Sequence, residues 1–179
     1  MSDTDLGQRF ACGGEEELEE IINLYGKKLL RYATAILCDY QEAENVVQEV
    51  FLAAYRTRTS FDGENISAWL YKITYHRSLN KLKKPKLLFF SEIFNETTEM
   101  LYGDTDLSEE TLTALRRLKP KDRALVYGRI IEEQTYEQLA SLLGSSPVAL
   151  RKQYERAKKQ LARYLSDSYY GKERNHEYI

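Results

Sequence analysis

Hydrophobic positions in the first half of the chain recur at helical spacing. Apolar side chains three or four residues apart over 18–36 predict an amphipathic helix, and the same period predicts a second helix over 41–58. A polar stretch with an Asp-Gly pair marks a loop over 59–65. A third helix is expected over 67–84, because Ser67 is a suitable cap and a proline follows directly.

The second half returns to helical spacing after residue 106. Two helices are expected over 111–118 and 120–132, the latter opened by a proline. A capping-box pattern then opens a short helix over 135–143, and Gly144 supplies a sharp turn. A Ser-Pro pair caps and starts a long last helix over 147–165.

These elements predict an all-α protein with two small helical domains joined by a linker, and no segment shows convincing strand alternation. The stretch before residue 107 lacks clean periodicity and is acidic in its second half, which is typical of a linker. The expected organisation is a loose N-terminal tail over 1–14, a first domain over 15–86, a linker over 87–108, a second domain over 109–166 and a C-terminal tail over 167–179.

The formal net charge of −2 conceals strong segregation of charge along the chain. Residues 66–90 carry six Lys or Arg and no acid, whereas 91–113 carry seven acids and no Lys or Arg. Over 114–165, Arg and Lys outnumber Asp and Glu by 12 to 5. Such blocks favour local contacts with a polyanion over a uniformly basic surface.

Other features argue against several classes of protein. Cys12 and Cys38 are too few and too irregularly placed for a disulfide framework or a zinc site. His76 and His176 are far apart, and no nucleophile motif, phosphate-binding loop or metal-ligand cluster is present. We therefore expect no enzyme activity, catalytic residue, metal or cofactor. Without a signal-peptide pattern or a membrane-length apolar run, we expect a cytoplasmic protein that does not insert into membranes.

The second predicted helix has two different faces. Ala43, Val46, Val47, Val50, Phe51 and Ala54 form an apolar stripe for the core. On the opposite face, Leu52 is surrounded by Asn45, Gln48, Glu49 and Arg56, with Tyr55 at the edge. The candidate contact residues on it, called the Leu52 face, are Asn45, Gln48, Glu49, Leu52 and Tyr55. It is either a solvated helix surface with one exposed leucine or a docking face for a basic partner.

The third predicted helix is basic and aromatic. Its expected core stripe is Ile66, Trp69, Leu70, Ile73 and Thr74, with a second apolar flank of Tyr71, Tyr75, Leu79 and Leu82. Between them lies the basic row: Lys72, His76, Asn80 and Lys83. Cations, an amide and an imidazole beside aromatic rings suit a nucleic-acid strand. The alternative is a solvated basic helix whose aromatic residues pack inside, and for Trp69 we favour packing.

The last two helices have a helix-turn-helix layout, with a short helix, a glycine turn and a capped second helix. A positive helix with small residues near its N-terminus can enter a major groove, which favours DNA binding over a generic helical hairpin. The outward residues, called the recognition face, are Val148, Ala149, Arg151, Lys152, Glu155, Arg156 and Lys159.

Three motifs in order resemble a bacterial sigma factor of the extracytoplasmic-function (ECF) type. Glu42-Ala-Glu-Asn-Val-Val-Gln-Glu-Val-Phe-Leu52 is similar to the family's Asp-Ala-Glu-Asp-Leu-Val-Gln-Glu-Val-Phe run, and Ala68-Trp-Leu-Tyr-Lys-Ile73 follows after a loop of the expected length. Tyr136, Glu137, Leu139, Ala140, Leu143 and Gly144 match its helix-turn-helix pattern. The resemblance covers about 16–84 and 111–165, which correspond to sigma regions 2 and 4.

The resemblance implies an alternative sigma factor that binds core RNA polymerase and directs promoter recognition, DNA melting and initiation. The Leu52 face would dock on the clamp helices of the largest subunit, and the flap would be a further contact. The basic row, with Tyr75 and with Asp62 and Asn65 of the preceding loop, would hold the separated minus-ten strand. The recognition face would read the minus-thirty-five duplex. A further implied partner is an anti-sigma factor, either membrane-bound or not.

The chain departs from the family pattern in places that affect these roles. Asn45 stands where Asp is usual, and His76 stands where Asn is frequent. In the recognition helix, Pro147-Val-Ala-Leu150 replaces the commoner Val-Gly-Thr-Val. An alternative function is a helix-turn-helix regulator that binds duplex DNA without being a polymerase subunit.

Overall fold

The chain is helical throughout its described part. The structure, a computed structural model, describes the backbone of residues 3–83 and 107–176 and the side chains of 4–83 and 107–167. Within these residues there are eight α-helices, one short 3₁₀ helix and no β-strand. The expectation of an all-α fold is therefore confirmed.

The chain divides into two compact units, Met1–Asp106 and Leu107–Ile179. Most of the linker expected over 87–108 lies outside the described residues. None of the helices in the described part combines the length and the apolar content that a membrane span requires.

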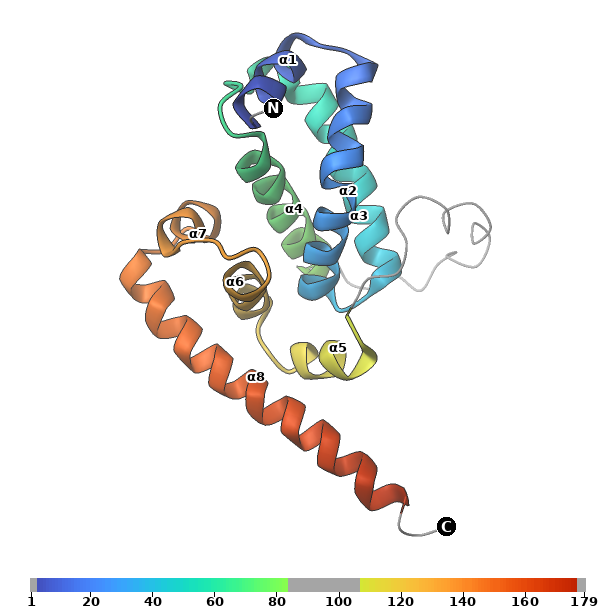
Figure 1. Ribbon diagram of the computed structural model, residues 1–179, viewed down its shortest axis with the longest axis vertical. Coiled ribbons are helices and arrows are strands. Elements are labelled where there is room, and N and C mark those ends of the chain that lie inside the picture. Colours follow the sequence, from blue (N-terminus) through green and yellow to red (C-terminus); the bar gives the residue numbers. More distant parts are fainter. Residues whose placement is uncertain (1–2, 84–106, 177–179) are drawn as a thin grey trace. The chain divides into compact units, whose positions relative to one another are not determined.

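The first unit is a helical bundle. Helices α2, α3 and α4 pack on one another side by side, and α1 lies across one end of the bundle (Figure 1). Its elements are α1 (Asp3–Cys12), α2 (Glu15–Leu37), α3 (Tyr40–Thr57), η1 (Arg58–Ser60) and α4 (Ile66–Lys83).

A tight connection lets α3 run back along α2. Cys38 has a left-handed conformation with φ of 53° and donates its backbone N–H to the Thr34 carbonyl oxygen at 2.7 Å. Asp39 then caps α3, because its carboxylate accepts the Glu42 backbone N–H at 3.1 Å. The apolar stripe predicted for α3, from Ala43 to Ala54, is buried as expected.

Helix α4 buries three of the five residues of the predicted core stripe, Ile66, Leu70 and Thr74, together with two tyrosines of the second flank. Its buried residues are Ile66, Leu70, Tyr71, Thr74, Tyr75 and Ser78. Trp69 and Ile73, expected in the core, are only half-buried. The sequence pattern predicted two apolar flanks on this helix. Packing against α2 buries the tyrosines of the second flank, and the ring centroid of Tyr71 lies 5.0 Å from that of Tyr32.

Two local expectations for the first unit are wrong. Residues 3–12 of the expected loose tail form α1, because Leu6 and Phe10 lie one turn apart and are buried at 2% and 0% exposure. Two apolar residues in a polar stretch are a weak sequence signal. The cap of α4 is Asn65 and not Ser67, since the Asn65 side-chain oxygen accepts the Ala68 backbone N–H at 2.8 Å.

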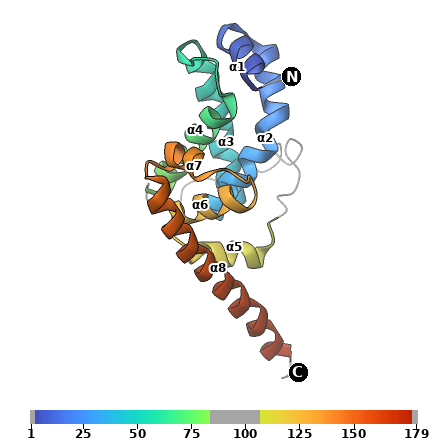
Figure 2. The ribbon, with the colours of Figure 1, turned by 60° about the vertical axis from the view of Figure 1, so that its left-hand side comes forward.

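The second unit is built around one long helix. Helix α8 packs against α5, α6 and α7 (Figure 2), and the buried residues include Leu115, Leu125, Leu139 and Leu150. The elements are α5 (Glu109–Arg116), α6 (Pro120–Ile130), α7 (Tyr136–Leu143) and α8 (Pro147–His176).

The turn chemistry predicted for the helix-turn-helix is confirmed. The Thr135 hydroxyl accepts the Gln138 backbone N–H at 3.2 Å, and the Gln138 side chain accepts the Thr135 backbone N–H at 2.8 Å. Gly144 ends α7 with φ of 62°, and the Ser146 hydroxyl caps α8. The C-terminal tail expected from residue 167 is instead a continuation of α8 to His176.

Candidate protein and nucleic-acid interfaces

The Leu52 face of α3 is largely open to solvent. Leu52 is 56% exposed, and Asn45, Gln48 and Glu49 are exposed around it. Tyr55 is partly covered, because the Arg58 guanidinium lies 4.1 Å from its ring centroid. An exposed leucine ringed by polar groups has the composition of an interface anchor.

Two ion pairs join α3 to the basic helix α4. Glu49 accepts a hydrogen bond from the Arg77 guanidinium at 2.8 Å, and the Lys81 ammonium lies 2.8 Å from the Glu42 carboxylate. Sequence reasoning assigned Glu49 to a protein partner alone and gave Arg77 and Lys81 no role. A partial signal was present, because Glu42 and Glu49 lie seven residues apart on one face of α3, and Arg77 and Lys81 lie four residues apart on one face of α4.

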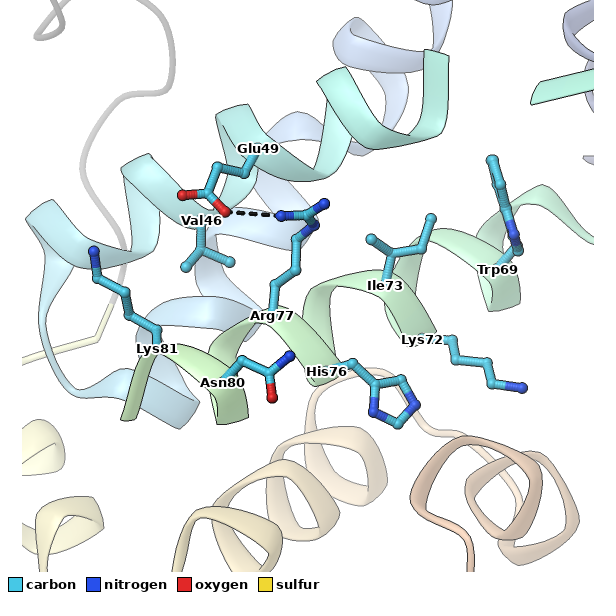
Figure 3. A pocket seen from close by; sticks show the side chains of 9 residues that line it. All are labelled: Val46, Glu49, Trp69, Lys72, Ile73, His76, Arg77, Asn80 and Lys81. Atoms are coloured by element: carbon cyan, nitrogen blue, oxygen red, sulfur yellow. Dashed lines mark hydrogen bonds and ion pairs between the residues drawn. The ribbon is translucent and has the colours of Figure 1, made fainter. Parts of the chain in front are cut away.

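An open hollow of about 760 Å³ lies where α3 and α4 meet. Figure 3 shows that Lys72, His76 and Asn80 leave α4 on one side, whereas Arg77 and Lys81 reach toward α3. Its lining combines a small apolar part with three cations, one carboxylate, one amide and one imidazole: Val46, Glu49, Trp69, Lys72, Ile73, His76, Arg77, Asn80 and Lys81. Such a surface can hold a base and its phosphate together.

The structure changes which aromatic residue belongs to this hollow. Tyr75, predicted to face a DNA strand, is only 4% exposed, and its burial raises the pKa of the phenol. Its ring is next to that of His76, with centroids 5.4 Å apart and an interplanar angle of 60°. Because Tyr75 is buried, it packs beside the basic row and cannot stack on a base. Trp69 lines the hollow instead. Its spacing of three and seven residues from Lys72 and His76 could have revealed this.

The loop before α4 has an ordered shape. The Asp62 carboxylate accepts the Glu64 backbone N–H at 3.0 Å, and Asn65 caps α4. Both side chains are exposed. On the α4 side, Phe61 stacks on Trp69 with ring centroids 4.5 Å apart and an interplanar angle of 18°. The loop therefore continues the surface formed by the basic row.

The recognition face of α8 is exposed along its whole length. All seven predicted residues are exposed, and Val148 near the start of the helix is 68% exposed. The exposed face extends to Lys159, two turns beyond Lys152. A cluster that sequence reasoning missed holds the helix in place: the Arg129 guanidinium lies 4.8 Å from the Tyr136 ring and 6.0 Å from the Tyr154 ring. These residues come from α6, α7 and α8, so the cluster orients the recognition helix.

No group of His, Cys, Asp or Glu within residues 4–83 and 107–167 is arranged to hold a metal ion. Cys12 is exposed and Cys38 is buried, and the two are not joined in a disulfide.

Comparison with known families assigns both units. Residues 21–86 match Sigma-70 region 2, and residues 108–161 match Sigma-70, region 4. The first match contains α3 and α4 with their candidate interfaces, and the second contains the helix-turn-helix.

Curated relatives extend the likeness over most of the chain. The ECF RNA polymerase sigma factor SigW of Bacillus subtilis is 23% identical over 87% of this chain and 92% of its own length. RNA polymerase sigma factor YlaC of the same species is 26% identical over 86% of this chain and 94% of its own length. The ECF sigma factor SigE of Mycolicibacterium smegmatis is 24% identical, and the match spans 83% of this chain but only 61% of SigE.

Solved structures that share the fold include CnrH and RpoE. CnrH, in complex with the cytosolic domain of CnrY, superposes with a TM-score of 0.70 at 20% identity and covers 92% of this chain and 97% of that chain. The sigma factor RpoE in complex with the anti-sigma factor NepR from Bartonella quintana has a TM-score of 0.67 at 21% identity, covering 84% of this chain and 98% of that chain. With both sigma regions matched in order, the chain belongs to the ECF family of RNA polymerase sigma factors and is an alternative sigma factor that directs transcription initiation.

Proposed function

We propose that this sigma factor binds core RNA polymerase through the Leu52 face of α3 and holds the separated minus-ten strand on the neighbouring surface of α4. The observation that carries the proposal is the adjacency of the two surfaces. The exposed Leu52 face and the hollow lined by Lys72, His76 and Asn80 lie on helices joined by the Glu49–Arg77 ion pair. A single rigid bundle can therefore present DNA beside a bound polymerase.

The polymerase contact is proposed to centre on Leu52. Burial of this side chain against the clamp helices of the largest subunit removes apolar surface from water, while Asn45 and Gln48 form a polar rim. The flap is proposed as a second contact, made by the region 4 unit.

The DNA contact is proposed to use the basic row, the loop residues Asp62 and Asn65, and Trp69. Cations at the hollow neutralise phosphates, and Trp69 offers the edge of a stacking surface. Separating a base from its stack costs a few kcal/mol, which contacts of this kind can offset. DNA melting then follows from binding energy without covalent chemistry, so the protein is proposed not to be an enzyme.

The duplex contact is proposed to lie on the recognition face of α8. Arg151, Lys152 and Arg156 are exposed there, together with the small side chains Val148 and Ala149 near the helix start. Small residues allow close approach to base edges in the major groove, and the cations position the helix on phosphates.

Further partners and a location are proposed by analogy with the family. Both solved relatives are complexes, one with the anti-sigma factor NepR and the other with the cytosolic domain of CnrY. We propose that this sigma factor also binds an anti-sigma factor, either anchored in a membrane or free, and that this partner holds it inactive. It is proposed to act in the cytoplasm, where core polymerase and promoter DNA are found.

Transcription from a promoter library tests the proposed function. The protein is added to core RNA polymerase with a pool of genomic promoter fragments, and run-off transcripts are sequenced. We expect transcripts that share upstream elements and depend on the added protein. Binding to duplex DNA without any binding to core polymerase would instead identify a helix-turn-helix regulator that acts alone.

A further inference from the structure

The N-terminal helix α1 packs directly on the loop over 61–65. Leu6 and Phe10 hold α1 on the bundle, and Gly7, which lies between them, is buried. A Cβ atom placed on Gly7 would lie 2.6 Å from the Gly63 carbonyl oxygen and 3.3 Å from the Phe61 ring. The backbones of helix and loop are therefore so close that no side chain fits between them.

The loop side of this contact also requires glycine. Gly63 is buried and has φ of +79°, a conformation that side chains disfavour. A Cβ atom there would lie 3.2 Å from the Cα atom of Gln8. Two glycines thus face each other, and the loop rests on the main chain of α1.

The loop is held from both sides. On one side it contacts α1, and on the other Phe61 stacks on Trp69 of α4 at 4.5 Å. Helix α1 is itself fixed to its neighbours, because Arg9 pairs with Glu20 of α2 at 2.8 Å. Arg58 also donates a hydrogen bond to the Gly13 carbonyl oxygen at 2.8 Å. The position of α1 is thereby transmitted to the loop.

We infer that α1 is a positioning element for base selection: the Gly7–Gly63 contact sets where Asp62 and Asn65 stand relative to His76 and Lys72. This inference rests on the proposed function of the loop and the basic row in holding the minus-ten strand. Gly7 and Gly63 act through the loop and do not touch DNA. Because hydrogen-bond discrimination between bases depends steeply on distance, a displaced loop loses selectivity before it loses affinity for phosphates.

The test compares Gly7→Ala with Gly14→Ala in the full chain bound to core polymerase. The added methyl group at Gly7 meets the loop backbone, whereas no heavy atom lies within 4 Å of the corresponding position at Gly14. Each holoenzyme selects from a pool of single-stranded DNA oligonucleotides of random sequence, and bound molecules are sequenced. For Gly7→Ala we expect broadened preference at one or two positions and about tenfold weaker binding of the best wild-type sequence, with polymerase affinity unchanged.

Two further variants address the same contact if Gly7→Ala does not fold. Gly63→Ala alters the contact from the loop side. Gln8→Ala trims an exposed side chain whose Cγ atom lies 3.1 Å from the Cβ position of Gly63, and it leaves the buried residues of α1 intact. We expect both to broaden the same positions, with the smaller effect for Gln8→Ala. Folding is checked by circular dichroism and by polymerase binding.

Variants of the loop itself separate the failure of this inference from that of the proposed function. If Asp62→Ala or Asn65→Ala changes base preference while the α1 variants select the wild-type sequences, the loop reads DNA without help from α1 and the inference is overturned. If neither loop variant changes base preference, the proposed role of the loop is itself wrong.

Discussion

The carboxylate of Glu49 on α3 lies 2.8 Å from the guanidinium of Arg77 on α4, and this pair forms the border between the two proposed interfaces. The Glu49 side chain is 54% exposed and that of Arg77 is 37% exposed. Figure 3 shows the pair bridging α3 and α4 among the side chains that line the hollow. Each member therefore has its charge partly neutralised before any partner binds.

Breaking this pair should change binding more than stability. Exposed ion pairs contribute about 0–1 kcal/mol, so we expect Glu49→Gln to change the free energy of unfolding by less than about 1 kcal/mol. The same variant removes a proposed polymerase contact and frees Arg77 for DNA phosphates. Holoenzyme assembly should weaken, while affinity for single-stranded DNA should rise and become more salt-dependent. Urea denaturation measures the change in stability, and anisotropy titrations at two salt concentrations measure DNA affinity. An unchanged salt dependence would show that Arg77 does not contact DNA phosphates.

Leu52→Asp should abolish polymerase binding without disturbing the fold. An exposed anchor residue contributes about 2 kcal/mol or more to an interface, which corresponds to at least roughly thirtyfold in affinity. Leu24→Asp is a matched control, because Leu24 is 49% exposed on α2, outside the Leu52 face. Surface plasmon resonance with immobilised core polymerase gives the affinities. Equal losses for both variants would show that the Leu52 face is not the specific contact.

Substitution of Trp69 and of Tyr75 tests which of these aromatic residues contacts the separated DNA strand. We expect Trp69→Ala to weaken binding of separated strand by about 1–3 kcal/mol, or roughly five- to 150-fold. Tyr75→Phe should leave binding unchanged, because Tyr75 is buried and the variant loses only its hydroxyl. Anisotropy of labelled single-stranded DNA on the holoenzyme provides the measurement. A loss with Tyr75→Phe and none with Trp69→Ala would reverse the assignment.

Arg123 should be a main determinant of stability in the second unit. Its buried guanidinium donates hydrogen bonds to the carbonyl oxygens of Leu115, Arg116 and Leu118 at 2.8 to 3.0 Å, which satisfies the end of α5. We expect Arg123→Met to cost roughly 2–3 kcal/mol, because these acceptors lose their partner in a buried setting. Arg163→Met, an exposed position on α8, is the control.

The single tryptophan allows this effect to be assigned to one unit. Trp69 lies in the first unit, so its fluorescence follows that unit, whereas circular dichroism follows both. Arg123→Met should lower the urea midpoint of the dichroism transition and leave the fluorescence midpoint in place. A shift of the fluorescence midpoint alone would contradict the predicted role of Arg123.

Glu17 should make the start of α2 sensitive to acid. The Gly14 backbone N–H donates to its carboxylate at 2.8 Å, and this hydrogen bond lowers the pKa of Glu17. Since the pKa is lower in the folded state, the stabilisation is complete above the ordinary glutamate pKa of about 4.3 and is lost as pH falls through the lowered value. Glu17→Gln should therefore be less stable than the wild type at neutral pH, and the difference should vanish in acid.

Thermal unfolding followed by Trp69 fluorescence across this pH range measures the difference. Glu16→Gln, in the same first turn but exposed, is the matched control. If the difference in thermal stability between wild type and Glu17→Gln stayed constant with pH, the hydrogen bond from Gly14 would not require the negative charge of the Glu17 carboxylate.

Local rules predicted much of the fold. The capping box of Thr135 and Gln138, the left-handed Gly144 and the buried stripe of α3 depend on residues close in sequence, and all three are confirmed. The weak points were segments with few apolar residues. Among the described side chains of helix α1, the large apolar ones that are buried are Leu6 and Phe10, and their contribution depends on a surface that distant residues create.

The candidate site likewise combines features set by residues close in sequence with features set by contacts between distant residues. The sequence by itself determined most of the helices, the order of the two units, and the residues of the basic row and of the recognition face, because helical period and charge are local properties. Only the tertiary structure decided that Tyr75 is buried while Trp69 lines the hollow, that Arg77 meets Glu49, and that Gly7 touches Gly63. A helical wheel gives the angles between side chains, whereas burial depends on which neighbour the helix packs against, and that choice is made by the whole core.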